Sequence, residues 1–242
     1  MSTPKRFDSY GASDIGKRRL FNEDRFAMRP DHGVWVVADG MGGHAGGDFA
    51  SQAVIDDLPG FEGVLTLGDL ETRFHDGLAE AHVRMLRVAK ALKADPMATT
   101  VVGLLIYQSE FAAIWSGDSR LYQWRDGVLR PVTRDHSEAR ELVDAGVLTA
   151  EQARTWHRRN VVTRALGVYD HLSAETAYGD AMPGDVFLLC SDGLTEHNRD
   201  EDIAAILGSA ETAEAAVGAL IDQTLDRGAI DNVTAVVVRV LA

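Results

Sequence analysis

Residues 36–47 read VVADGMGGHAGG, an apolar run that ends in Asp39 and continues into a glycine-rich loop. A short apolar run followed by glycines is typical of a buried β-strand. Glycine directly after Asp39 lets the backbone turn sharply, so that a backbone carbonyl could face the same ligand as the carboxylate. An Asp-Gly pair alone indicates only a turn. A functional interpretation therefore depends on whether other carboxylates repeat the arrangement.

Further runs rich in Val, Leu, Ile and aromatic residues predict several more strands. Two gaps between these runs, Gln108-Ser109 and Asp126-Gly127, have the length of tight hairpin turns, and hairpins join antiparallel strands. The ranges that we expect to form strands are 33–39, 100–107, 111–116, 120–124, 128–133, 185–191 and 233–241.

Three stretches have apolar residues at helical spacing, namely residues 49–58, 69–92 and 210–225. Helices in separate blocks and strands in consecutive hairpins predict the α+β class, with antiparallel sheets covered by helices. No internal repeat or low-complexity linker divides the 242 residues, so we expect one domain over residues 1–242. Residues 134–167 are charged and contain two short helix patterns around Gly146; an inserted flap and a plain helical connection fit this pattern equally well.

The composition limits the classes of partner. Hydrophobic residues make up 45% of the chain and charged residues 25%, which is typical of a globular protein. A net charge of −13 disfavours nucleic acid and anionic membranes as partners, because both would be repelled. The single cysteine, Cys190, lies in an apolar run and is expected to be a buried structural thiol in a reducing compartment. The N-terminus has no signal-peptide pattern, and we expect a cytoplasmic monomer.

Several acidic residues lie at the ends of predicted strands. Asp39, Asp118 and Asp192 follow apolar runs, whereas Asp231 directly precedes one. In an antiparallel sheet the end of one strand and the start of its neighbour share an edge, so these acids could meet. Glu23 and Asp24 add two adjacent acids before another strand-like segment. Carboxylates brought together repel one another unless a cation neutralises them, and oxygen ligands suit Mg²⁺ or Mn²⁺.

The glycine-rich loop fits other phosphate or metal sites poorly. The segment GMGGHAGG lacks the Lys-Ser/Thr ending of a P-loop and the alternating acids of an EF-hand. His44 within it is more typical of an exposed loop residue than of a ligand or a catalytic acid.

The chain contains five short motifs in the following order: RLFNED, VVADGMGG, SGDSR, LLCSDGLTE and DNVTAVVVRV. In these motifs and their order it resembles the PP2C (PPM) family of metal-dependent protein serine/threonine phosphatases. The resemblance extends from about residue 13 to residue 240. The resemblance implies an α/β/β/α sandwich of two antiparallel sheets flanked by helices. It also implies two Mn²⁺ or Mg²⁺ ions at the rim between the sheets. A hydroxide that bridges these ions would attack phosphorus, without a phosphoenzyme.

The resemblance also assigns roles to particular residues. Asp39 would bridge the two metals, and Arg19 would bind the substrate phosphate, with Arg18 as the alternative if the loop register differs. Asn232 would support the ligands without binding metal itself. The residues that resemble metal ligands are Glu23, Asp24, Asp39, Gly40, Asp118, Asp192 and Asp231, of which Asp118 would hold a third, weaker metal together with Asp192.

One position departs from many eukaryotic members, because Met41 stands where they have the histidine proposed as general acid. Methionine cannot donate a proton, so metal-bound water or another group such as His44 would have to protonate the leaving alkoxide. Bacterial relatives commonly share this methionine. Residues 134–167 fall where bacterial members have a flap beside the site, which favours the flap interpretation.

The resemblance implies phosphorylated proteins as substrates and a bacterial serine/threonine kinase as the opposing enzyme. Two other functions stay open at this point. A catalytically silent phosphoprotein-binding module on the same fold would usually have lost metal ligands, whereas every candidate acid is present here. A phosphohydrolase for small molecules would differ in its preference for free phosphomonoesters over phosphothreonine peptides.

Overall fold

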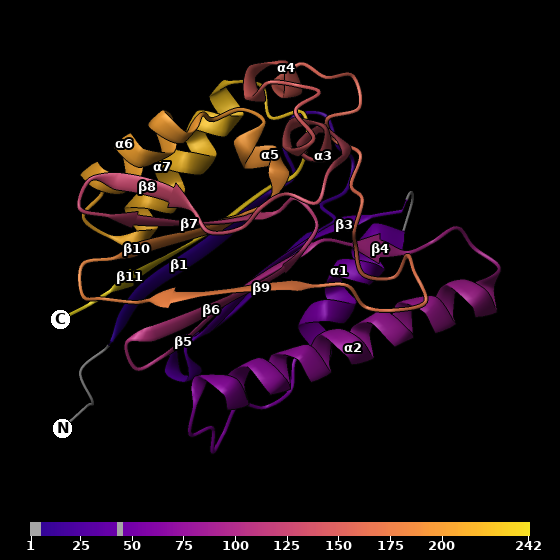
Figure 1. Cartoon of the computed structure of the whole chain (residues 1–242), viewed down its shortest axis with the longest axis horizontal. Coiled ribbons are helices and arrows are strands. Elements are labelled where there is room, and N and C mark those ends of the chain that lie inside the picture. The colour runs from indigo at the N-terminus through magenta and orange to yellow at the C-terminus, as the bar shows by residue number, and fades with distance from the viewer. Residues whose placement is uncertain (1–5, 43–45) are drawn as a thin grey trace.

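The computed structural model describes residues 6–42 and 46–242. Its strands form two antiparallel sheets that pack face to face, with helices on both outer sides (Figure 1). The fold is therefore the predicted α+β sandwich. The five-stranded sheet has the order β1-β11-β10-β7-β8, and the six-stranded sheet has the order β2-β3-β5-β6-β9 with β4 paired to β3.

All of the expected strands are present, and four more accompany them. The strands of the five-stranded sheet are β1 (Phe7–Asp14), β7 (Arg120–Arg125), β8 (Val128–Pro131), β10 (Val186–Cys190) and β11 (Val233–Val240). Those of the six-stranded sheet are β2 (Asp24–Arg29), β3 (Val34–Met41), β4 (Ala98–Thr99), β5 (Val101–Tyr107), β6 (Glu110–Ser116) and β9 (Glu175–Asp180). The pairs Gln108-Ser109 and Asp126-Gly127 are the predicted hairpin turns, since Tyr107 pairs with Glu110 and Arg125 with Val128.

The helices lie in two outer layers and one projection. The helices are α1 (Gly46–Asp56), α2 (Leu67–Leu92), α3 (Glu138–Asp144), α4 (Ala150–Arg154), α5 (Asp192–Thr195), α6 (Asp200–Ser209) and α7 (Ala213–Asp226), with a short 3-10 turn η1 (Pro30–His32). Helices α1 and α2 cover the six-stranded sheet, and α6 and α7 cover the five-stranded sheet (Figure 1). Helix α2 begins where Thr66 Oγ1 accepts a hydrogen bond from the Asp69 amide at 3.0 Å.

Successive side chains along a strand point to opposite faces of its sheet, and this alternation divides the core into layers. In β3, Val34 and Val36 face the helices α1 and α2, whereas Trp35 and Val37 face the other sheet. This period of two is the ordinary geometry of a β-strand, and it lets one strand contribute to two hydrophobic clusters. Cys190 is buried in the third cluster, beneath α6 and α7, as expected for a structural thiol. Burial raises the pKa of its thiol to about 12.

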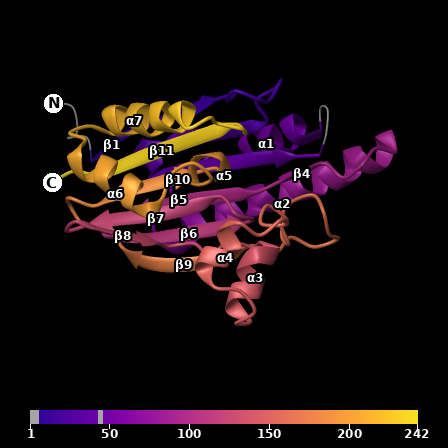
Figure 2. The ribbon, with the colours of Figure 1, turned by 90° about the horizontal axis from the view of Figure 1, so that it is seen from above.

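The segment 134–167 leaves the body of the molecule at one side and carries α3 and α4, as Figure 2 shows. The isolated bridge between Thr99 and Leu166 attaches it to the sandwich, and the bridge between Ser137 and Val162 joins two parts of the segment itself. Asn160 Nδ2 also donates to Glu196 Oε1 at 2.5 Å, just after α5. The two short helices around Gly146 are thus confirmed, while the role of this segment as a flap of a single domain stays a prediction.

Candidate metal centre

The predicted acids meet at one end of the sandwich. Asp24 and Asp39 are direct cross-strand partners in β2 and β3. Asp192 is the first residue of α5 after β10, and Asp231 stands two residues before β11. Asp118 follows β6, and its neighbour Gly117 turns the chain with a φ of 115°. The charges of Asp24, Asp118, Asp192 and Asp231 all act on Asp39, so the five carboxylates lie in one region of the molecule.

The glycines that follow two of these aspartates mark places where another segment crosses the chain. A Cβ atom on Gly40 would lie 2.1 Å from the Gly47 carbonyl oxygen and 2.7 Å from that of Glu23. A Cβ atom on Gly193 would lie 1.9 Å from the Asn232 carbonyl oxygen. These distances are too short for any side chain. Glycine at both positions therefore allows the segments that carry Glu23 and Asp231 to approach Asp39 and Asp192.

The Asp24 side chain is 2% exposed, and only one of its two carboxylate oxygens has hydrogen-bond partners among the described residues. Its Oδ2 accepts hydrogen bonds from Ser191 Oγ and Thr234 Oγ1, both at 2.7 Å. Its Oδ1 is buried and, among the described residues, has no hydrogen-bond partner; the same holds for Glu23 Oε1. A buried carboxylate oxygen without a donor is costly in free energy. Both atoms are therefore suited to accept a cation.

The electrostatics of the site favour protonation of the acids in the absence of a cation. Burial, followed by the charges of neighbouring acids, raises the pKa of Asp39 and of Asp192 well above the usual value. Burial raises the pKa of Asp24 to about 6, although hydrogen bonds from Thr234 and Ser191 oppose the shift. Burial and the nearby Asp135 raise the pKa of Asp118 to about 7. Bound divalent cations would remove this repulsion.

Arg19 lies on the loop before β2 and forms an ion pair with Asp231, with Nη2 2.5 Å from Oδ2. The predicted phosphate ligand and a predicted metal ligand are thus in direct contact. Within the described residues, no three acidic, histidine or cysteine side chains converge to the spacing of a preformed metal site. The donor chemistry suits hard divalent cations, and a cation that uses Asp231 would compete with Arg19 for it.

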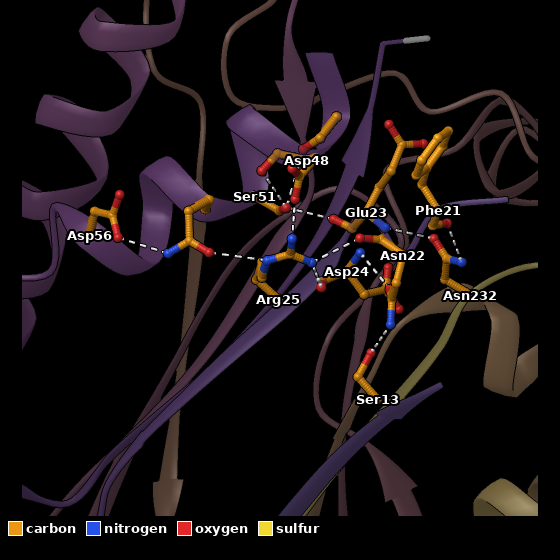
Figure 3. A network of polar contacts seen from close by, with 12 residues as sticks. Ser13, Phe21, Asn22, Glu23, Asp24, Arg25, Asp48, Ser51, Asp56 and Asn232 are labelled. Atoms are coloured by element: carbon orange, nitrogen blue, oxygen red, sulfur yellow. Dashed lines mark hydrogen bonds and ion pairs between the residues drawn. The ribbon is translucent and has the colours of Figure 1, made fainter. Parts of the chain in front are cut away.

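A polar network behind the acids holds their loop in place. Asn232, the predicted supporting residue, accepts a hydrogen bond from the Glu23 amide at 2.9 Å through Oδ1. Arg25, which the sequence did not single out, donates to the Asn22 and Asp24 carbonyls at 2.8 and 2.7 Å and also bonds to Asp48 on α1 (Figure 3). Arg25 therefore connects α1 to the segment that carries Glu23 and Asp24.

Two hydroxyl residues at the site were also missed, Ser191 and Thr234. Ser191 directly precedes Asp192, and Thr234 lies three residues after Asp231. Their proximity in sequence to candidate ligands is the signal that could have found them. Met41 ends β3 beside the site, opposite Ala98 of β4. His44, the alternative proton donor, and the rest of residues 43–45 lie outside the described residues.

Several known proteins are similar to this chain. The model of the family "Protein phosphatase 2C" matches residues 11–228. The serine/threonine phosphatase Stp of Listeria monocytogenes is 32% identical over an alignment of 234 positions that covers 93% of either chain. The structure of PppA, described as a key regulatory component of the type VI secretion system in Pseudomonas aeruginosa, matches with a TM-score of 0.88 and 39% identity over 96% of this chain and 97% of that one. The catalytic domain of the phosphatase PstP in complex with two manganese ions matches with a TM-score of 0.84 and 33% identity, over 98% of this chain and 99% of that one.

In the described residues, no helix has both the length and the apolar character needed to cross a bilayer.

Proposed function

The chain belongs to the protein phosphatase 2C family, and from this premise we propose that it hydrolyses phosphoserine and phosphothreonine in proteins with the help of bound divalent cations. The observation that carries the proposal is the group of buried and half-buried carboxylates in which burial, followed by mutual repulsion, raises the pKa of Asp39. Such a group is stable in its charged form only when cations neutralise it. The relatives named as serine/threonine phosphatases support the choice of substrate.

The acids of the site would hold two cations. Asp39 would contact both, with Asp192 and Asp231 on one side and Glu23 and Asp24 on the other. The carbonyl of Gly40 would add a ligand, and Asp118 would help to hold a third, weaker cation with Asp192. When bound, the cations supply Lewis-acid charge to the phosphoryl oxygens and lower the pKa of water. The PstP domain with two manganese ions supports the number of cations, and the choice between Mn²⁺ and Mg²⁺ is open to the assay below.

Arg19 would bind the phosphate of the substrate. Its side chain is half exposed and already contacts Asp231, so it stands between solvent and the acids. The planar guanidinium pairs with two phosphate oxygens and stays charged at every physiological pH, which orients the phosphoryl group for in-line attack. Met41 cannot give a proton to the leaving alkoxide, so this chain uses a proton source other than the residue after Asp39-Gly40.

The substrates would be phosphoproteins made by a serine/threonine kinase. A narrower form of the proposal is a role in regulating type VI secretion, which the 39% identity to PppA supports. Neither a silent phosphoprotein-binding module nor a phosphohydrolase for small molecules is favoured, because every candidate ligand is present and the relatives are named as protein phosphatases. A cytoplasmic location is proposed from the single buried Cys190, which fits a reducing compartment.

Hydrolysis of phosphothreonine peptides by the purified chain, with added Mn²⁺ or Mg²⁺ and then with excess chelator, tests the proposal. We expect turnover that requires metal and stops with chelator, and slower turnover of free phosphomonoesters. Thermal unfolding in the same buffers reports metal binding independently of activity. Metal binding without turnover of any phosphopeptide would favour the binding-module function. The absence of metal binding would contradict the metal centre itself.

A further inference from the structure

The loop beside Arg19 exposes two large apolar side chains. Residues 17–21 read KRRLF, and all five are exposed. Leu20 is 84% exposed and Phe21 is 67% exposed. Removal of such apolar surface from water is favourable, so a partner that covers Leu20 and Phe21 would gain binding free energy.

This exposure belongs to a loop that is well anchored. The Lys17 amide donates to the Ala229 carbonyl at 2.8 Å. The Asn232 side-chain amide donates to the carbonyls of Ile15 and Phe21, at 2.9 and 3.0 Å. Gly16 has a φ of 74°, and a Cβ atom there would lie 2.1 Å from the Asp231 carbonyl oxygen. The backbone that presents Leu20 and Phe21 is therefore fixed against the segment 229–232.

The same contacts bring two further apolar residues, Ile15 and Ile230, to the loop. The backbone carbonyls of Ile15 and Phe21 both accept from the side-chain amide of Asn232. Ile230 lies between Ala229 and Asp231, whose backbones both contact the loop at residues 16–17. Ile15 and Ile230 are also exposed. In Figure 3 the ring of Phe21 and the side chain of Glu23 project to the same side of the loop. We refer to Ile15, Leu20, Phe21 and Ile230 as the apolar rim.

The apolar rim is continuous with the proposed phosphate site. Leu20 follows Arg19 in the chain, Ile230 precedes Asp231, and Arg19 and Asp231 are joined by the 2.5 Å ion pair. A phosphate bound by Arg19 would therefore lie at the edge of the rim. Lys17, Arg18 and Arg19 are three consecutive exposed cations in a chain of net charge −13, so this is a place where an anionic substrate is attracted.

We propose that the apolar rim binds an apolar side chain of the phosphoprotein substrate, within three residues of the phosphorylated residue. An extended peptide advances about 3.3 Å per residue, so side chains this close to the phosphate must cross the surface next to Arg19. The inference rests on the proposed function, since it specifies which phosphopeptides the same site prefers. It makes Leu20 and Phe21 determinants of specificity, and they take no part in the chemistry.

The test uses phosphothreonine peptides in a serine-glycine background, each with one leucine at a different position from three residues before to three after the phosphothreonine. The kcat/KM of each peptide is compared with that of the leucine-free peptide, and p-nitrophenyl phosphate turnover normalises for the amount of active enzyme. We expect a preference of about fivefold to tenfold for leucine at one or two adjacent positions, which corresponds to about 1–1.4 kcal/mol and is at the low end of what an apolar contact discriminates. In Leu20→Ser/Phe21→Ser the preference should fall to less than twofold.

Leu65→Ser is the matched control, because Leu65 is 74% exposed on the loop before α2 and is not part of the apolar rim. It should keep the full leucine preference. A wild-type chain that treats all of the peptides alike, or a double variant that keeps the preference, would overturn the inference while leaving the proposed function intact. Failure of the wild-type chain to hydrolyse any phosphopeptide with Mn²⁺ present would overturn both.

Discussion

At the start of β10, Asp185 is 1% exposed and is fully paired, whereas Asp192, two residues beyond the other end of the same strand, lies among other acids. Arg125 donates to both carboxylate oxygens of Asp185 at 2.6 Å, and Gln123 and the Met182 amide donate to Oδ2 at 3.1 and 2.8 Å. The chain itself supplies the cation that this buried carboxylate needs.

At the opposite end of β10, the acids Asp24, Asp39 and Asp192 have no cationic side chain of this kind among the described residues. Burial and like charges raise the pKa of Asp39 and Asp192 instead. A buried acid that is paired with its own arginine is part of the structure, because loss of the arginine would leave a buried charge uncompensated. A group of partly buried acids without such a partner can instead bind a cationic ligand. Asp185 at one end of β10 is thus a structural carboxylate, whereas Asp192 beyond the other end belongs to the proposed functional group.

The largest expected effect is that of Asp39→Asn. The amide cannot act as an anionic ligand for two cations, so phosphopeptide turnover should fall by roughly a hundredfold or more. Without metal the variant should be at least as stable as the wild-type chain, because one of the repelling charges is gone. Asp31→Asn, an exposed site in η1 away from the acids, is the matched control. Robust turnover by Asp39→Asn would rule out the bridging role.

The reverse result is expected for Arg125→Ala. Asp185 would stay buried with only Gln123 and the Met182 amide as donors, which should cost about 3 kcal/mol of unfolding free energy. For a chain of this length that corresponds to a decrease in Tm of about 6–12 °C. Phosphopeptide turnover at a temperature well below Tm should stay within twofold of the wild type. Arg130→Ala, exposed on the adjacent strand β8, controls for the loss of an arginine; an equal loss of stability there would contradict the pairing argument.

A smaller effect should appear in the pH dependence of the metal-free chain. Burial and Asp135 raise the pKa of Asp118 to about 7, above the value of about 3.9 for an unfolded aspartate. A raised carboxyl pKa contributes stability that is complete below the unfolded pKa and is lost as the pH rises through the folded pKa. Between about pH 5 and about pH 7 the wild-type chain should therefore lose about 2 kcal/mol relative to Asp118→Asn.

Urea unfolding with chelator at both pH values measures this difference. Asp126→Asn, in the exposed β7–β8 turn, should follow the wild-type profile. Identical profiles for Asp118→Asn and the wild-type chain would show that Asp118 titrates as it does in water. The two ends of β10 would then differ less than their surroundings suggest.

The sequence predicted the interior of the fold better than its edges. Strands β3, β5, β6 and β10 are recognisable because both of their faces are apolar and buried. Strands β1 and β9 were not predicted, and both are edge strands with many partly exposed polar residues and glycine. An edge strand buries less apolar surface, so its hydrophobic pattern is weaker and its pairing is decided by its neighbour.

The site, like the fold, was predicted only in part from the sequence. Acids at strand ends are visible in the sequence, because antiparallel pairing brings the ends of neighbouring strands together. Their partners are not, because the bonds from Ser191 and Thr234 to Asp24 depend on how two different sheets are placed against each other. The contact between Arg19 and Asp231, more than 200 residues apart, likewise requires the finished fold.

Strand β11 has a consequence for the synthesis of the protein. It pairs along its whole length with β1, the first strand in the described part of the chain, and its other edge pairs with β10. Until the ribosome has released β11, the nascent chain carries two unpaired strand edges and a site without Asp231 and Asn232. Pairing across so large a sequence separation is slow, since a long loop must close first. The sheet and the acidic site are therefore completed together, by the last strand to emerge.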